Sequence, residues 1–112
     1  MKKYFVFGLV AVLPFVAQAT SFDVAHIREQ GQDMIVFPMN SSIDYKSDQQ
    51  KREIMFDLQR CASSARLADS VVIMWEGSGQ TKFMAPQQWS SFFRSVNMLW
   101  LAKNINKKLS CR

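Results

Sequence analysis

The N-terminal segment constrains this chain most, because it decides how much sequence is left to fold. Lys2 and Lys3 precede an apolar run over residues 4–17, and residues 17–19 (AQA) have small side chains at both positions of an A-x-A cleavage site. This arrangement is typical of a secretory signal peptide. The apolar run is shorter than the roughly 20 residues that a membrane-spanning helix needs. We therefore expect residues 1–19 to be removed; the alternative is an uncleaved N-terminal anchor.

The exported part is small and mildly basic. Removal of residues 1–19 from the 112 leaves 93, which is enough for one small domain over residues 20–112. Without Lys2 and Lys3 the chain keeps 12 basic and 9 acidic residues, a net charge of +3. This charge slightly favours acidic partners but is far from that of a nucleic-acid-binding domain. No second apolar run is long enough to span a membrane, so we expect a periplasmic or secreted product.

Two cysteines, Cys61 and Cys111, lie in the exported part. In an oxidising compartment an even number of cysteines indicates a disulfide, and two cysteines allow one pairing within the chain. A redox site would usually show C-x-x-C and a structural zinc site needs four ligands, whereas this chain adds only one histidine, His26. We expect a structural disulfide and no metal or cofactor; a free or intermolecular thiol is the alternative. Closing a loop of about 50 residues stabilises a domain by roughly 4 kcal/mol on the chain-entropy model.

Hydrophobic patterning predicts the first three elements of the domain. Strands are expected over residues 22–28 and 33–38, with a turn at 29–32 between them and a polar linker over 40–45 after them. Ser47 and Gln50 form a capping box that begins a helix. This helix is expected to end near residue 68, and its inward face would hold Ile54, Leu58, Cys61, Ala65 and Ala68.

The second half repeats this order. Residues 71–75 (VVIMW) form a continuous apolar run, typical of a strand buried on both faces, and residues 81–84 are expected to pair with it. Pro86 begins a last helix that extends to about residue 108. The sequence thus predicts an α+β, two-layer domain in ββαββα order. Its antiparallel sheet would carry both helices on one face, with one disulfide.

The segment EGSGQTK over residues 76–82 contains the residue types of a phosphate-binding loop: glycines, hydroxyl residues and a lysine. A P-loop needs G-x-x-x-x-G-K-[ST] followed directly by a helix, and the dinucleotide pattern needs a third glycine where this chain has Lys82. Two glycines between apolar strands are instead what a hairpin turn requires. We therefore expect a turn.

The sequence offers few candidate catalytic residues. His26 could act as a general base with Asp23 or Asp33 orienting it, but no G-x-S-x-G elbow is present. A glycosidase needs two carboxylates in a cleft, and Glu76 is the only carboxylate that follows a buried strand. A hairpin-end position is the better explanation for Glu76. The sequon at residues 40–42 matches a glycosylation acceptor, which we take as accidental because the leader is of bacterial type.

The last helix carries the most informative surface. Its main apolar stripe comprises Trp89, Phe92, Phe93, Val96, Leu99 and Trp100. At 100° per residue a second set of apolar residues falls on a different face: Met98, Leu101, Ile105 and Leu109. The basic residues that flank this face are Lys103, Lys107, Lys108 and Arg112. Three interpretations compete for this second face: burial within the domain, contact with a protein partner or a second copy, and binding to anionic lipid.

The functional hypothesis is an exported, non-enzymatic accessory protein of the bacterial envelope that binds a protein partner through Met98, Leu101, Ile105, Lys103 and Lys107. Such a protein could belong to a secretion or conjugation system. One alternative is a secreted toxic, inhibitor or immunity factor, and another is a small hydrolase that uses His26. No nucleic-acid partner is expected.

Overall fold

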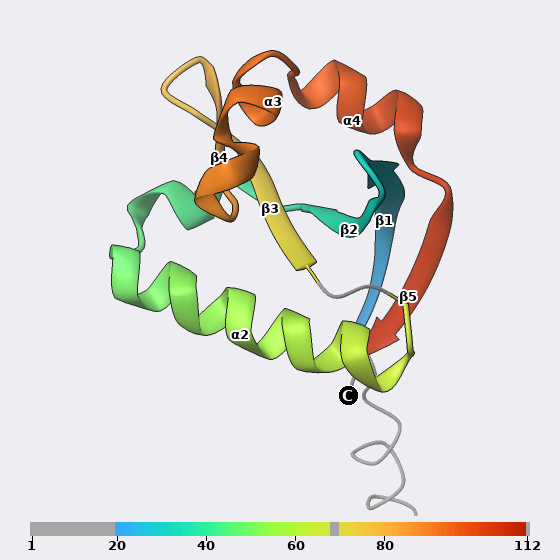
Figure 1. Ribbon diagram of the computed structural model, residues 1–112. Coiled ribbons are helices and arrows are strands. Elements are labelled where there is room, and N and C mark those ends of the chain that lie inside the picture. The colour runs from blue at the N-terminus through green and yellow to red at the C-terminus, as the bar shows by residue number, and fades with distance from the viewer. Residues whose placement is uncertain (1–19, 68–69, 112) are drawn as a thin grey trace, which may run out of the picture.

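The computed structural model describes residues 20–67 and 70–111, which form a five-stranded sheet with helices on both faces (Figure 1). The predicted leader, residues 1–19, lies outside the described residues, as does Ala68. The strands are β1 (Thr20–Glu29), β2 (Gln32–Pro38), β3 (Ser70–Gly77), β4 (Gln80–Met84) and β5 (Lys107–Cys111). The α-helices are α2 (Asp48–Ser64), α3 (Ser90–Arg94) and α4 (Met98–Asn104); the short 3-10 helices η2 (Ser41–Tyr45) and η3 (Gln87–Trp89) precede α2 and α3. The α+β class, the small size and the Cys61–Cys111 disulfide are confirmed.

The sheet has the strand order β4-β3-β2-β1-β5 and is mixed. β2 and β3 run parallel, with Met34 opposite Ser70 and Pro38 opposite Met74, whereas the other neighbouring strands are antiparallel. This corrects the antiparallel arrangement that we expected. The connection from β2 to β3 includes α2, and a helical crossover returns the chain to the end of the sheet where β2 began, so β3 runs in the same direction.

The helices cover both faces of the sheet, which corrects the prediction that they share one face (Figure 1). Successive side chains of a strand point to opposite faces. On β3, Val71, Ile73 and Trp75 therefore pack towards α2, and Val72 and Met74 pack towards α3 and α4. All five are buried, as the continuous apolar run predicted. A sheet with two apolar faces must bury both, so one helical layer cannot suffice.

Both predicted hairpin turns are present. Gln30 and Gly31 have φ angles of 50° and 79°, and Ser78 and Gly79 have φ angles of 55° and 75°. Positive φ at both central residues defines the type I′ turn, whose twist matches that of a two-stranded hairpin. The segment EGSGQTK is therefore the β3–β4 turn, as expected.

α2 begins as the capping box predicts. The Ser47 hydroxyl accepts from the Gln50 N–H at 3.1 Å, and the Gln50 side chain accepts from the Ser47 N–H at 2.9 Å. The helix ends at Ser64, earlier than expected, because Arg66 adopts a positive φ of 57° and closes the last turn. Leu58 and Ala62 are buried against the sheet, whereas Ala65 is exposed.

The expected single helix over residues 86–108 is divided into η3, α3 and α4, and its last part is a strand. The helical turns of α3 stop at Ser95. Asn97 has an extended backbone, and its side chain accepts from the Trp100 N–H at 2.9 Å, so it caps a new helix. β5 then pairs with the first half of β1, from Thr20 opposite Cys111 to Val24 opposite Lys107.

Candidate functional site

The break at Asn97 reverses which leucine of α4 faces the solvent. On one continuous helix over residues 86–108, Leu99 falls on the main apolar stripe and Leu101 on the second face, for which burial and contact with a partner were both open. In the structure Leu101 is 1 % exposed and packs against the sheet, whereas Leu99 is 62 % exposed. A new helix start resets the angular phase, so a projection that crosses the break loses its phase there, and it assigns Leu99 to the wrong face.

The outward face of α4 is therefore formed by Leu99, Ala102 and Lys103, all of which are exposed. Leu99 and Lys103 are four residues apart and so are neighbours on the helix surface. Lys107 is also exposed and begins β5 shortly after α4 ends. We call Leu99, Ala102, Lys103 and Lys107 the α4 surface.

The five predicted partner-binding residues divide into three groups. Lys103 and Lys107 lie on the α4 surface. Met98 and Ile105 are half-buried and pack against the core beneath α3 and α4. Leu101 lies within that core. The α4 surface therefore keeps Lys103 and Lys107 from the predicted patch, leaves out its three apolar residues, and takes Leu99 and Ala102 in their place. Whether the remaining residues bind a partner stays a prediction.

Charge is strongly segregated along this chain. Residues 77–112 contain six basic residues and no aspartate or glutamate. In the described part of the chain, two of these six form ion pairs: Lys82 with Asp44 and Lys108 with Asp23. Lys103 and Lys107 form none there, so the α4 surface combines an exposed apolar side chain with free positive charge. That combination complements a partner that is acidic and partly apolar.

A second polar cluster surrounds Asp44, in the segment that we expected to be a linker. Asp44 Oδ1 accepts from Trp75 Nε1 at 3.0 Å and from Lys82 Nζ at 3.0 Å. The hydrogen bond from Trp75, then that from Lys82, together with the nearby ammonium charges, hold the pKa of the Asp44 carboxyl below its usual range. Lys51 is only 9 % exposed, and its Nζ atom lies 5.2 Å from the centroid of the Trp75 ring.

This cluster joins η2 to the β3–β4 hairpin. Gly77 lies so close to Asp44 that a Cβ at position 77 would be 2.5 Å from the carboxyl carbon. Gly77 therefore serves close approach, whereas Gly79 supplies the positive φ of the turn. With a carboxylate that is already hydrogen-bonded and held in its charged form, the cluster is suited to holding elements together and not to accepting a proton.

His26 lies on β1 near its crossing with the α4–β5 connection. The Asn106 side chain accepts from the His26 N–H at 2.8 Å and donates to the His26 carbonyl oxygen at 2.9 Å. The two carboxylates that were candidates to orient the imidazole are engaged elsewhere: Asp23 pairs with Lys108 and Asp33 pairs with Arg28. Nε2 of His26 is buried and has no hydrogen-bond partner in the described part. The geometry therefore gives the hydrolase hypothesis no support.

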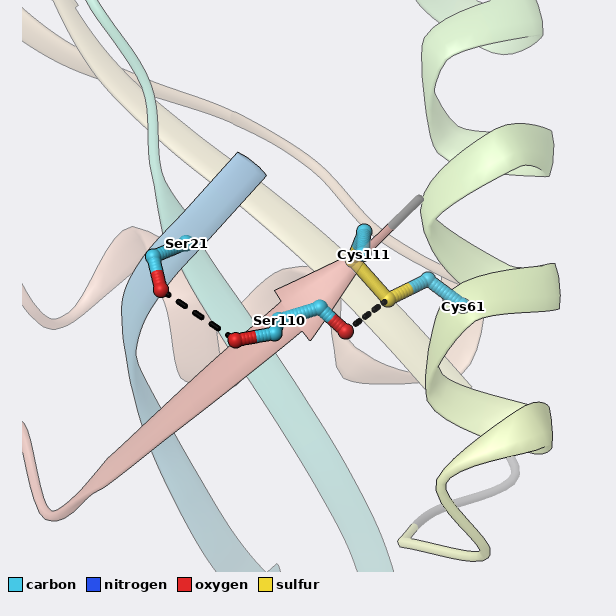
Figure 2. The surroundings of a disulfide bond; sticks show 4 residues. All are labelled: Ser21, Cys61, Ser110 and Cys111. Carbon is cyan, nitrogen blue, oxygen red and sulfur yellow. Dashed lines mark hydrogen bonds between the residues drawn. A yellow bond between two sulfur atoms is a disulfide. The ribbon is translucent and has the colours of Figure 1, made fainter. Parts of the chain in front are cut away.

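The disulfide joins the inner face of α2 to the end of β5 (Figure 2). The Cα atoms of Cys61 and Cys111 are 5.5 Å apart. The Ser110 carbonyl oxygen lies 3.7 Å from the Cys61 sulfur, which in a disulfide has no proton to donate, and the Ser110 hydroxyl is 3.3 Å from that of Ser21 on β1. The bond therefore fastens the edge strand β5, and through it the start of β1, to α2.

A cavity of about 760 Å³ adjoins this disulfide. Its charged lining residues, Asp57 and Arg60, pair with each other at 2.6 Å, and its hydroxyls come from Ser64 and Ser110. None of the lining residues is a histidine that could activate a hydroxyl. The residues that line this cavity therefore do not include a nucleophile paired with a histidine base.

Two further features of the described residues concern metal binding and membrane spanning. Within residues 20–67 and 70–111 no group of three or more histidine, cysteine or carboxylate side chains is placed to hold a metal ion. Nor does any helix in that part combine the length and the apolar character needed to cross a membrane. Comparison of the chain with protein-family models, curated proteins and solved structures finds no match.

Proposed function

We propose that this protein is an exported, non-enzymatic binding protein of the bacterial envelope, and that it docks an acidic, partly apolar surface of a protein partner on the α4 surface. The observation that carries the proposal is the exposure of Leu99, at 62 %, beside Lys103 in a segment without any carboxylate. A disulfide across the fold agrees with an oxidising compartment such as the periplasm. An accessory role in a secretion or conjugation system fits such a surface.

The partner is expected to be a different protein and not a second copy meeting the first α4 surface to α4 surface. Two such surfaces facing each other would bring Lys103 and Lys107 of both copies together, and like charges in contact weaken association. Because the charges are exposed, binding should weaken as ionic strength rises, with a Debye length of about 10 Å at 0.1 M salt.

Affinity capture from the native envelope tests this proposal when it is done with matched variants. The oxidised protein, Lys103→Glu and Leu99→Asp are compared with Lys46→Glu, which reverses the charge of another exposed lysine, just after η2. We expect one envelope protein to be retained by the unmodified chain and by Lys46→Glu and to be lost with the other two. Retention of that protein by Lys103→Glu and Leu99→Asp would contradict the proposal.

Anionic vesicles provide the second arm of the test. A basic, apolar helix face could also bind anionic lipid. Binding of the oxidised protein to anionic vesicles that is abolished by Lys103→Glu, together with no retained protein in the capture, would replace the protein partner with a lipid surface.

A further inference from the structure

α2 carries an exposed apolar residue on the opposite side of the sheet from the α4 surface (Figure 1). Phe56 is 66 % exposed and lies at the midpoint of the helix, which spans Asp48–Ser64. The opposite face of the helix packs against the sheet through Leu58 and Ala62. Phe56 is therefore not needed for packing within the domain, and its ring is available for contact with another molecule.

The charges around Phe56 differ in kind from those of the α4 surface. Arg52, Glu53, Asp57 and Arg60 are all exposed and sum to zero. Arg60 is held beside the aromatic ring, with its guanidinium carbon 5.6 Å from the ring centroid and a nitrogen 2.6 Å from Asp57. A face of mixed charge that sums to zero does not repel a copy of itself, whereas the basic α4 surface does.

The positions of these charges fit a twofold axis at Phe56. With a rise of about 1.5 Å and a turn of about 100° per residue, Glu53 lies about 4.5 Å before Phe56 and Arg60 about 6 Å after it. Both lie on the same side of Phe56, at about 60° and about 40° around the helix. A twofold axis reverses the helix direction and keeps the side, so Glu53 of one copy comes opposite Arg60 of the other.

The other side of the helix fits the same axis. Arg52 lies about 6 Å before Phe56 and Gln59 about 4.5 Å after it, both turned by about 40–60° in the opposite sense. The same operation therefore places Arg52 of one copy opposite the Gln59 side-chain oxygen of the other. Arginine has five N–H donors, so Arg60 can keep Asp57 while it also binds the Glu53 of the second copy.

We propose that this protein forms a twofold-symmetric homodimer in which the α2 helices of two copies pack antiparallel, with Phe56 against Phe56 at the axis and Glu53 paired with Arg60 on both sides. The dimer uses a surface separate from the α4 surface, which it leaves free on both outer sides. One helix face provides less than the roughly 800 Å² per partner of a standard interface, so the association is weak.

Sedimentation equilibrium of the oxidised protein as the cell produces it, up to about millimolar concentration, measures this association. We expect a reversible monomer–dimer equilibrium. Phe56→Asp should raise the dissociation constant at least about tenfold, since buried aromatic side chains dominate small interfaces. Leu99→Asp is the matched control and should leave the equilibrium unchanged, because Leu99 is nearly as exposed as Phe56, at 62 % against 66 %, but lies on the other side of the sheet.

A charge exchange tests the antiparallel geometry and does not depend on Phe56. Glu53→Arg and Arg60→Glu should each weaken the dimer, because each places like charges opposite each other, and the double variant should restore it. Circular dichroism confirms that each variant is folded. A protein that stays monomeric at all concentrations, a dimer that only Leu99→Asp dissociates, or a double variant as weak as the single ones would overturn the proposal.

Discussion

Replacement of Leu101 by alanine should destabilise this domain far more than the same replacement at Leu99, two residues earlier on the same helix. Leu101 is 1 % exposed and packs with Met34, Val36 and Trp89 in the core beneath α4. Truncation of a buried leucine removes its transfer free energy and leaves a cavity, which costs about 2–5 kcal/mol. Leu99 is 62 % exposed, so its truncation should change stability by no more than about 0.5 kcal/mol.

The difference in unfolding free energy between the two alanine variants is large compared with the stability of the whole domain. Small domains have a free energy of unfolding of about 5–15 kcal/mol, and for this size about 1 kcal/mol shifts the Tm by roughly 4–8 °C. A loss of about 3 kcal/mol at Leu101 should therefore lower the Tm by about 12–24 °C. Urea and thermal unfolding of the oxidised protein, followed by circular dichroism, measure both variants.

Variants of Asn97 test whether a new helix start at this residue is what turns Leu101 inward and Leu99 outward. Asn97→Ala removes the cap of α4 and should cost about 1 kcal/mol, whereas Asn97→Ser should keep most of the stability. If Leu99→Ala were the more destabilising of the two leucine variants, or if the two were equal, the new helix start at Asn97 and the reassigned α4 surface would both be wrong.

Three further predictions concern the parts that hold the fold together. The double variant Cys61→Ser/Cys111→Ser should lose roughly 4 kcal/mol in urea unfolding, because the bond closes a loop of 50 residues; a loss below about 1 kcal/mol would refute this. The folded-state pKa of Asp44 lies below its usual 3.8, so its stabilisation is present above that pH and is lost as the pH falls through the folded-state pKa. The stability gap between the unmodified protein and Asp44→Asn should therefore narrow on acidification, and a gap that widens would contradict the sign. Gly77→Ala should cost about 1–3 kcal/mol because its Cβ meets Asp44, and the cost should fall in an Asp44→Ala background.

Local signals predicted the parts of the fold that depend on neighbouring residues. The capping box at Ser47 and the glycine turns at Gly31 and Gly79 are each fixed within a few residues, and all three are present. The disulfide followed from counting cysteines. The apolar run at residues 71–75 predicted a strand buried on both faces, as observed. The same run should have indicated helices on both sides of the sheet, whereas we predicted them on one side.

The features that sequence reasoning missed depend on long-range packing. β5 has a single buried residue, Leu109, among lysines and small residues, and becomes a strand because β1 offers it a free edge. Asn97 carried a helix-start signal inside the expected last helix, which could have been recognised because asparagine is a favoured N-cap. Asp44 gave no such signal, since its partners Trp75 and Lys82 lie more than 30 residues away.

Whether the α4 surface binds a protein partner is tested most directly by photo-crosslinking in the native envelope, with benzoylphenylalanine placed at position 99. The same group at position 45 serves as the control, since Tyr45 is 90 % exposed but lies in η2, away from α4. We expect a covalent adduct with a second, different protein from position 99, reduced by Lys103→Glu, and none from position 45. An adduct from position 45 alone, or equal adducts from both positions, would contradict the assignment of α4 as the partner-binding surface.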